Sequence, residues 1–328
     1  MKIIFSHTDL DGLGVYCLVK YYHISYDFFY ILNYNDYEEY EDTIEQLDEN
    51  DQIIFTDFSP NKKWMNILEK NNVKVKIYDH HGSLDDKNSA CYMIKNWNYK
   101  NCIYFYEDHV SGTEIFFKNF IVKYYETKPI INQFCKLVTA FDCGLKDSPL
   151  YTMGTDLNRL FWKTVLYSKQ GLERHDAFIN NFMIYKFDHY TEFKWNKLEE
   201  TKISEDKKRE LEIFNNLIKG GKDTIKTRKD DLGRYFCVIK LRSKSSGISN
   251  MIFNKYKKVD YVLIINEYDK ENKKLSFRGR DDKEGIDGNK LEGFKGHALA
   301  CGYEQITNEL CEDLWRGKIY SFPIRKDS

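Results

Sequence analysis

Short apolar runs alternate with longer segments of mixed charged and apolar residues over the first 125 residues of the chain. Five of the runs predict strands, at 2–5, 27–32, 52–55, 73–78 and 103–105. The segments between them predict helices, at 12–22, 37–47, 62–71 and 112–125. Strands and helices that alternate at this spacing are typical of βαβ units. The pattern therefore predicts an α/β fold built on a mostly parallel sheet.

The remainder of the chain predicts more helix and then a second set of strands. Residues 130–181 have a helical pattern, and residues 188–219 are charged and helix-favouring, as in a connecting helix. After the turn signal Gly220-Gly221, we expect strands at 235–241, 260–266 and 274–278, and helices at 246–256 and from about His297. This predicts a larger domain at 1–187, a helical linker at 188–221 and a smaller α/β domain at 222–328.

The composition excludes several classes of partner. The net charge is −1 over 328 residues, which argues against avid binding of long duplexes, because such binding depends on neutralising many phosphates. No apolar run approaches the length that spans a bilayer, so no membrane association is expected. The eight cysteines show no paired metal spacing, and the first residues predict a strand rather than a leader. We therefore expect a cytoplasmic protein with reduced thiols.

Acids and histidines directly follow three of the predicted strands. They are His7, Asp9 and Asp11 after the first strand, Asp57 after the third, and Asp79, His80 and His81 after the fourth. Because parallel strands end at one edge of their sheet, we expect these side chains to lie together. Carboxylates mixed with imidazoles bind hard or borderline divalent cations, and two such cations about 3.5–4 Å apart promote phosphodiester hydrolysis. The pattern therefore predicts a metal centre.

This arrangement resembles the DHH phosphoesterase superfamily, which is named for the triplet seen here as Asp79-His80-His81. Residues 7–12 are similar to the family's first motif, Asp57 to its second, and Asp142, within residues 139–143, to its fourth. Residues 275–278 and 296–302 resemble the DHHA1 domain that accompanies one branch of the family, so the resemblance covers almost the whole chain. Within the superfamily the chain is most similar to the nano-RNase B-type oligoribonucleases, through residues 6–12 and 75–81.

The resemblance implies a role for each residue of the centre. One metal ion would be bound by His7 and Asp9, the other by Asp11, His80 and Asp142, with Asp57 as the bridge and the water between the ions as nucleophile. His81 would contact the scissile phosphate, and Asp79 would orient a neighbouring histidine. The mixed oxygen and nitrogen ligands favour two Mn²⁺ ions, with Mg²⁺ or Co²⁺ as substitutes.

The same resemblance assigns substrate binding to the C-terminal domain. Arg278 would hold a phosphate by two parallel hydrogen bonds, with Ser276 on the same strand. Gly296, before His297, would let the backbone approach an anion closely. Asn250 is a further candidate contact for a phosphate or sugar.

The chain departs from the family pattern at two places. The usual glycine run before the DHHA1 histidine is here Gly293-Phe294-Lys295-Gly296, which makes the loop bulkier and adds a cation. Cys143-Gly144 follows Asp142 where the nearest subfamily commonly has an aromatic residue.

Structural roles compete with these functional ones. Asp9 or Asp11 alone would be read as a helix N-cap, and Asp57 alone as a turn residue before Pro60. Asp147 and Asp156 are alternatives to Asp142 as the last ligand. Arg278 could be an exposed strand charge, and His297 a helix cap.

The leading hypothesis is a metal-dependent phosphodiesterase that releases nucleoside monophosphates from short single-stranded oligonucleotides or linear dinucleotides. A phosphatase of 3′,5′-bisphosphonucleotides or a hydrolase of cyclic dinucleotides stays open within the same superfamily. From another class, the chain could be a nucleotide-binding module without catalysis. The sequence leaves open the polarity of cleavage, RNA or DNA preference, substrate length and whether the chain forms oligomers.

Overall fold

The computed structural model describes most of the chain, in two compact units. It covers residues 1–33, 36–82, 84, 89–166, 171–242, 247–267, 273–280, 288, 291, 294–297, 300–303, 307–319 and 322, without the side chains of 165–166, 171–174, 181, 294–297 and 300–301. The first unit is Met1–Ile203 and the second is Ser204–Ser328.

The first unit is built on a five-stranded sheet with the order β2-β1-β3-β4-β5, in which every neighbouring pair is parallel. The strands are β1 (Lys2–His7), β2 (Phe28–Leu32), β3 (Gln52–Thr56), β4 (Lys74–Asp79) and β5 (Cys102–Tyr106). The connection from β1 runs outward to β2, and β3 returns to the other side of β1. In such sheets the carboxyl ends of the strands beside this reversal carry the binding site. Here they are the ends of β1 and β3.

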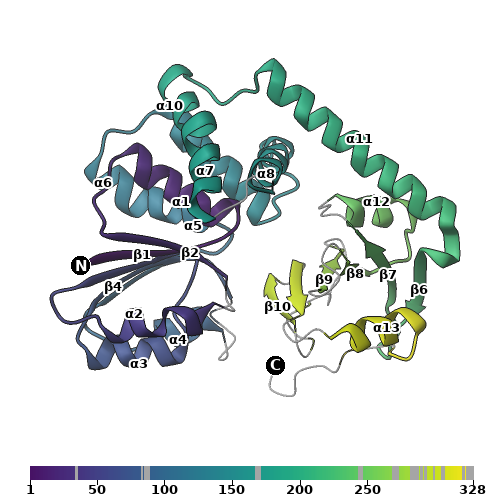
Figure 1. Ribbon diagram of the computed structural model, residues 1–328, viewed down its shortest axis with the longest axis horizontal. Helices are drawn as coiled ribbons and strands as arrows, with labels where there is room; N and C mark the ends of the chain where they lie inside the picture. Colours follow the sequence, from purple (N-terminus) through teal and green to yellow (C-terminus); the bar gives the residue numbers. More distant parts are fainter. Residues whose placement is uncertain are drawn as a thin grey trace. The chain divides into compact units, whose positions relative to one another are not determined.

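Helices cover both faces of this sheet (Figure 1). Successive residues of a strand point to opposite faces, so Ile4 and Ile54 enter one core while Ile3 and Phe5 enter the other. The first core is closed by α1 (Leu10–Tyr21), α5 (Gly112–Phe116), the π-helical turn η2 (Phe117–Ile121) and α7 (Pro129–Asp142). The short helix α6 (Val122–Tyr124) between η2 and α7 has no buried residue. The second core is closed by η1 (Tyr37–Tyr40), α2 (Glu41–Glu45), α3 (Lys62–Lys70) and α4 (Ala90–Lys95).

The rest of the first unit is helical, as the sequence predicts. It contains α8 (Tyr151–Leu166), α9 (Gly171–Phe178), η3 (Ile179–Ile184), α10 (Tyr185–His189) and the start of α11 (Lys197–Gly220), which continues into the second unit. The fully buried Lys186 joins α10 to α11, because its ammonium group donates to Glu199 Oε2 at 2.8 Å and to the carbonyl of Lys194 at 2.7 Å.

The second unit has a six-stranded mixed sheet with the order β10-β11-β9-β8-β7-β6. Its strands are β6 (Ile225–Lys229), β7 (Tyr235–Leu241), β8 (Tyr261–Asn266), β9 (Lys274–Gly279), β10 (Phe294–His297) and β11 (Ala300–Tyr303). Its helices, besides the second part of α11, are η4 (Gly221–Asp223), α12 (Ile248–Lys255) and α13 (Asn308–Arg316). The α/β class with a parallel sheet and a second, smaller α/β unit is confirmed.

The helix expected near the C-terminus is wrong. The helix predicted from about His297 is instead the hairpin β10–β11, in which Phe294 pairs with Tyr303 and His297 with Ala300, and the next helix begins at Asn308. Residues 300–302 pair with β9, and this tertiary pairing outweighs any local helical preference there. Within the described residues, no helix is both long and apolar enough to cross a bilayer.

Candidate metal centre

The loop after β1 places a histidine and an aspartate side by side. Asp9 is the N-cap of α1, and its Oδ1 accepts the backbone N–H groups of Asp11 and Gly12 at 3.1 Å each. Its Oδ2 lies 2.8 Å from Nδ1 of His7, the last residue of β1. The N-cap role weighed from the sequence is therefore real, but it uses only one oxygen of the carboxylate. The other oxygen contacts the imidazole of His7.

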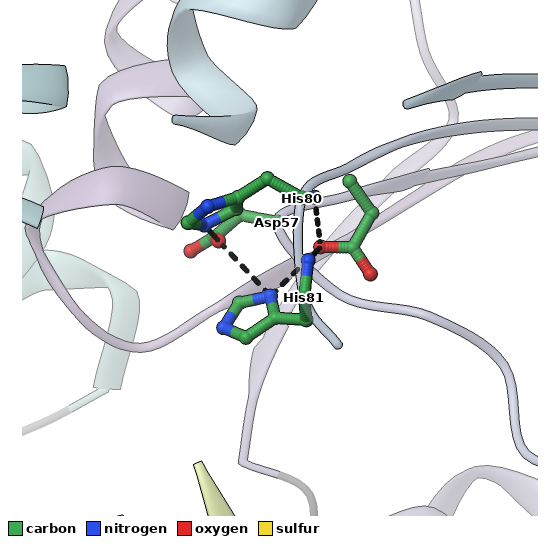
Figure 2. A group of neighbouring side chains, drawn as sticks. Asp57, His80 and His81 are labelled. Carbon is green, nitrogen blue, oxygen red and sulfur yellow. Dashed lines mark hydrogen bonds and ion pairs between the residues drawn. The ribbon is translucent and has the colours of Figure 1, made fainter. Parts of the chain in front are cut away.

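Asp57 follows β3 and lies beside His80 and His81 (Figure 2). Its Oδ1 is 3.2 Å from Nε2 of His80 and 3.6 Å from Nδ1 of His81, while its Oδ2 is 3.9 Å from Nδ1 of His7. The residue is buried and has a left-handed backbone with φ of 51°. An aspartate adopts this region at a cost, and such outliers gather at functional sites. Oδ2 is buried and accepts no hydrogen bond from the part of the chain that is described.

Asp79, at the end of β4, orients the two histidines that follow it. Its Oδ1 accepts the backbone N–H of His80 at 2.8 Å and of His81 at 3.2 Å, and lies 2.7 Å from Nδ1 of His81. Its Oδ2 accepts a hydrogen bond from the hydroxyl of Ser59. Burial acts to raise the pKa of Asp79, but His81 outweighs it and lowers this pKa to about 2. Asp79 is therefore an ionised group whose oxygens are engaged by donors of the protein.

Three carboxylates lie around one ring nitrogen of His80. Its Nε2 lies 3.4 Å from Oδ2 of Asp11, 3.2 Å from Oδ1 of Asp57 and 3.3 Å from Oδ2 of Asp142. Asp142 is the last residue of α7, so a helix rather than a strand delivers it. Of the alternatives weighed for this position, Asp147 is exposed, and Asp156 lies on α8 with Oδ1 at 3.8 Å from Nε of Arg159.

The pKa values of several of these acids and of His7 are shifted from their ordinary values. Burial raises the pKa of Asp57 well above its ordinary value, and the carboxylates of Asp11, Asp9 and Asp142 raise it further. Burial also raises the pKa of Asp142, again with help from Asp11 and Asp9. Burial acts in the same direction on the pKa of Asp9, but His7 outweighs it and lowers that pKa below the usual range. In return Asp9 overcomes the burial of His7 and raises the pKa of this imidazole.

These observations fit a pair of divalent cations. The group His7, Asp9 and Asp57 could hold one ion, and His80 lies beside a second group of acids with Asp57 in common. Ligand atoms that bind one cation at about 2.0–2.3 Å lie roughly 3–3.5 Å from each other, which agrees with the His80 distances. The buried Oδ2 of Asp57 and the raised carboxyl pKa values mark negative charge that a cation would stabilise.

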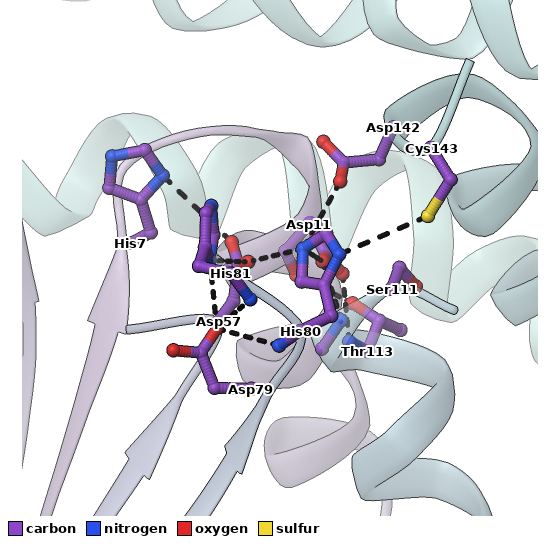
Figure 3. A network of polar contacts seen from close by, with 12 residues as sticks. His7, Asp11, Asp57, Asp79, His80, His81, Ser111, Thr113, Asp142 and Cys143 are labelled. Carbon is purple, nitrogen blue, oxygen red and sulfur yellow. Dashed lines mark hydrogen bonds and ion pairs between the residues drawn. The ribbon is translucent and has the colours of Figure 1, made fainter. Parts of the chain in front are cut away.

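The sequence did not reveal the supporting residues of this centre. Cys143 has Sγ 3.9 Å from Nδ1 of His80, and Ser59 contacts Asp79. The backbone N–H groups of Gly112 and Thr113 donate to the carboxylate of Asp11 (Figure 3). The sequence hints at the contact with Asp11 only through Ser111, a serine at the start of a predicted helix. Such a serine indicates an N-cap but does not indicate a partner a hundred residues earlier.

The substrate-binding candidates lie in the second unit. On β9, Leu275 and Phe277 are buried, whereas Ser276 and Arg278 are partly exposed and point to the opposite face. Ala300 of β11 pairs with Arg278 on one side and with His297 on the other. The side chain of His297 is outside the described part of the chain. Of the other two candidates, Gly296 of β10 pairs with Cys301 of β11, and Asn250 is exposed on α12.

Comparison with known proteins shows the fold. No protein-family model matches the chain, and no curated protein matches it. The pGpG-specific phosphodiesterase PggH from Vibrio cholerae aligns with 97% of this chain and 97% of its own, at 13% identity and a TM-score of 0.54. The two chains share a fold. RecJ from Thermus thermophilus, solved with Mn²⁺, aligns with 99% of this chain and 53% of its own, at 13% identity and a TM-score of 0.49.

Proposed function

We propose that the chain is a metal-dependent phosphodiesterase of the DHH/DHHA1 type that hydrolyses short oligonucleotides, linear dinucleotides among them, to nucleoside monophosphates. The observation that carries the proposal is the position of Asp57, whose two carboxylate oxygens face His7 on one side and His80 on the other. A carboxylate placed in this way can bridge two cations. The fold shared with PggH, which its name describes as acting on pGpG, agrees with a phosphodiesterase of short substrates.

The residues that would hold the metals are those of the two groups around Asp57. One ion would bind to His7, Asp9 and Asp57, and the other to Asp57, His80, Asp142 and the remaining lone pairs of Asp11. Two such ions supply a water nucleophile at neutral pH and neutralise charge on the phosphoryl oxygens. Oxygen and nitrogen ligands without a thiolate favour Mn²⁺, with Mg²⁺ or Co²⁺ as substitutes.

His81 would contact the scissile phosphate. Nδ1 of His81 donates to the ionised Oδ1 of Asp79 at 2.7 Å, which fixes the orientation of the ring and leaves Nε2 for another partner. The side chain of His81 is 16% exposed, whereas that of His80 is 3% exposed. His81 is thus the histidine of the pair that a substrate can reach.

The second unit would supply substrate contacts. Arg278 can offer a phosphate two parallel N–H donors, and Ser276 offers a hydroxyl on the same face of β9. Gly296, His297 and Asn250 complete the proposed set. A site that holds one or two phosphates by a few donors suits a short substrate, and the net charge of −1 argues against a long duplex.

The test is a panel of RNA and DNA oligomers of two to ten nucleotides, each labelled at one end, in the presence of Mn²⁺. A 3′,5′-bisphosphonucleotide and a cyclic dinucleotide belong in the same panel, because hydrolysis of either in preference to the linear oligomers would select the alternative activity. Wild-type protein should release labelled mononucleotide, and Asp57→Ala should lose roughly a hundred-fold or more of this rate, since even second-sphere changes cost 10–100-fold. The exposed Asp147→Ala should keep the wild-type rate. Equal turnover in Asp57→Ala and wild type would exclude the proposal.

A further inference from the structure

The helix that begins at Gly112 holds Asp11 from a distance of about a hundred residues. The backbone N–H of Gly112 donates to Oδ2 of Asp11 at 2.7 Å, and that of Thr113 donates to Oδ1 at 2.7 Å. The hydroxyl of Thr113 donates to the backbone carbonyl of Asp11 at 2.5 Å. Both residues and Asp11 are buried. Each oxygen of this carboxylate is therefore fixed by α5 before any cation binds.

The same turn of helix supports Asp57. A methyl group on Gly112 would lie 2.7 Å from Cβ and 2.8 Å from Cα of Asp57, so only glycine allows this approach. The backbone of Asp57 is in the left-handed region at this contact. The start of α5 thus packs directly against the strained residue that lies between the two groups of ligands.

A buried network ties this turn to α7, which carries Asp142. The hydroxyl of Thr139, on α7, lies 2.9 Å from Oγ of Ser111 and donates to Oε2 of Glu114 at 2.6 Å. The backbone N–H of Ser111 donates to Oγ1 of Thr139 at 3.3 Å. Ser111 is also the N-cap of α5, since its Oγ accepts the N–H of Glu114 at 3.2 Å. Thr139 lies three residues before Asp142, almost one helical turn away.

We propose that residues 111–113 and Thr139 form a positioning scaffold that holds Asp11, Asp57 and Asp142 in one arrangement, so that the hydroxyl of Thr139 sets metal affinity without contacting the metal. The inference rests on the proposed function, since it concerns the cations of that site. Figure 3 shows Ser111 and Thr113 behind His80 and Asp11, on the side of the cluster opposite His7.

The physical reason is preorganisation. The carboxylates of Asp11, Asp57 and Asp142 all lie within 3.4 Å of the same nitrogen of His80, so like charges are crowded together and repel one another. Without a fixed frame they would move apart, and a cation would then have to reassemble them on binding. A frame that already holds them lowers this cost, and outer-sphere partners of this kind typically change metal affinity 10–100-fold.

The test is a calorimetric titration of the full chain with Mn²⁺ for wild type, Thr139→Val, Thr139→Ser and Ser111→Ala. Thr139→Val keeps the shape of the side chain and removes the hydroxyl, so the dissociation constant for at least one Mn²⁺ should rise about ten-fold. Thr139→Ser restores the hydroxyl and should bind as wild type does. Ser111→Ala removes the partner hydroxyl and should weaken binding in the same direction, which keeps the test decisive if Thr139→Val does not fold.

The matched control is Thr155→Val. Thr155 is also a helical threonine, and its hydroxyl donates at 2.9 Å to the carbonyl of Tyr151 within its own helix. Metal-free thermal melts of all variants report folding separately. Wild-type affinity in Thr139→Val and Ser111→Ala, or equal weakening in Thr155→Val, would overturn the scaffold and leave the proposed function standing. Failure of the wild type to bind Mn²⁺ would instead overturn the proposed function itself.

Discussion

At the scale of single residues, the centre is an excess of buried negative charge. Asp11, Asp57 and Asp142 all lie within 3.4 Å of the same nitrogen of His80, and one imidazole cannot neutralise three carboxylates. Burial and the neighbouring carboxylates raise the pKa values of Asp57 and Asp142, so protons compete for these groups. A cation that enters the site must therefore displace protons.

This competition gives metal binding a definite pH dependence. The pKa values of Asp57, Asp142 and His7 are all raised, so each group keeps its proton to a higher pH than an isolated side chain does. Because the proton and the cation compete for the same lone pairs, Mn²⁺ affinity should increase as the pH rises from about 5 through neutrality. Titrations in buffers of different ionisation enthalpy should show net proton release. An affinity that is constant or falls over this range would contradict the assignment of these three residues as ligands.

Single residues also show which parts of the site can be predicted from the sequence and which cannot. Asp9 and Asp57 could be named as candidates because each follows an apolar strand and the ends of parallel strands meet. Asp142 could be separated from Asp147 and Asp156 only through a family resemblance, since α7 is a helix and its end has no fixed place at the sheet edge. The contact between Gly112 and Asp11 spans 101 positions, and no local pattern encodes it.

At the scale of elements, close packing of α1 against α5 brings the ligands together. Gly14, inside α1, leaves room for Thr113, because a methyl group there would overlap the hydroxyl of Thr113. Gly12 is likewise pressed against the backbone of His7. Gly14 is thus needed for helix packing, and Gly12 is needed for the turn out of β1.

The substitution Gly14→Ala tests this packing by the sign of its effect. In the interior of a helix, alanine is ordinarily favoured over glycine by about 1 kcal/mol. Here the added methyl group would displace Thr113, so the free energy of unfolding should fall by about 1–3 kcal/mol, as in other overpacked cores. The double variant Gly14→Ala with Thr113→Ala should lose less than the sum of the two single variants. Stabilisation by Gly14→Ala alone in denaturant unfolding would contradict the packing described.

The elements also show where local pattern fails. The strands of the first unit are predicted from apolar runs to within one or two residues, and the central strands β1 and β3 are buried on both faces. The sequence predicts a helix from about His297, where the structure has the strands β10 and β11, because the pairing of β11 with β9 is a tertiary effect that a local pattern does not encode. The single helix expected at 112–125 is interrupted by the π-helical turn η2, which the apolar pattern does not encode.

At the scale of the whole molecule, the chain divides its proposed tasks between two units. The acids and histidines of the centre all lie within Met1–Ile203, and Arg278 and Ser276 lie within Ser204–Ser328. The sequence predicts this division from the turn at Gly220-Gly221, whereas the compact units meet inside α11. A long, charged helix reads as a linker in the sequence, although part of α11 packs in the core of the second unit.

This division predicts that the two tasks can be separated by substitution. Arg278→Ala should raise KM for a dinucleotide roughly ten-fold or more, because a charge-assisted hydrogen bond contributes about 1.5–3 kcal/mol, while the affinity for Mn²⁺ should not change. Arg316→Ala, at an exposed position on α13, is the matched control and should leave both quantities unchanged. Loss of Mn²⁺ binding in Arg278→Ala would contradict the assignment of metal binding to the first unit alone.

The central claim, a pair of cations bridged by Asp57, can be measured directly by electron paramagnetic resonance of the protein loaded with two equivalents of Mn²⁺. A shared carboxylate between ions about 3.5–4 Å apart should produce the spectrum of an exchange-coupled pair. Asp57→Asn should convert it to that of isolated ions or abolish binding. Isolated-ion spectra from the wild type, unchanged in Asp57→Asn, would contradict the account.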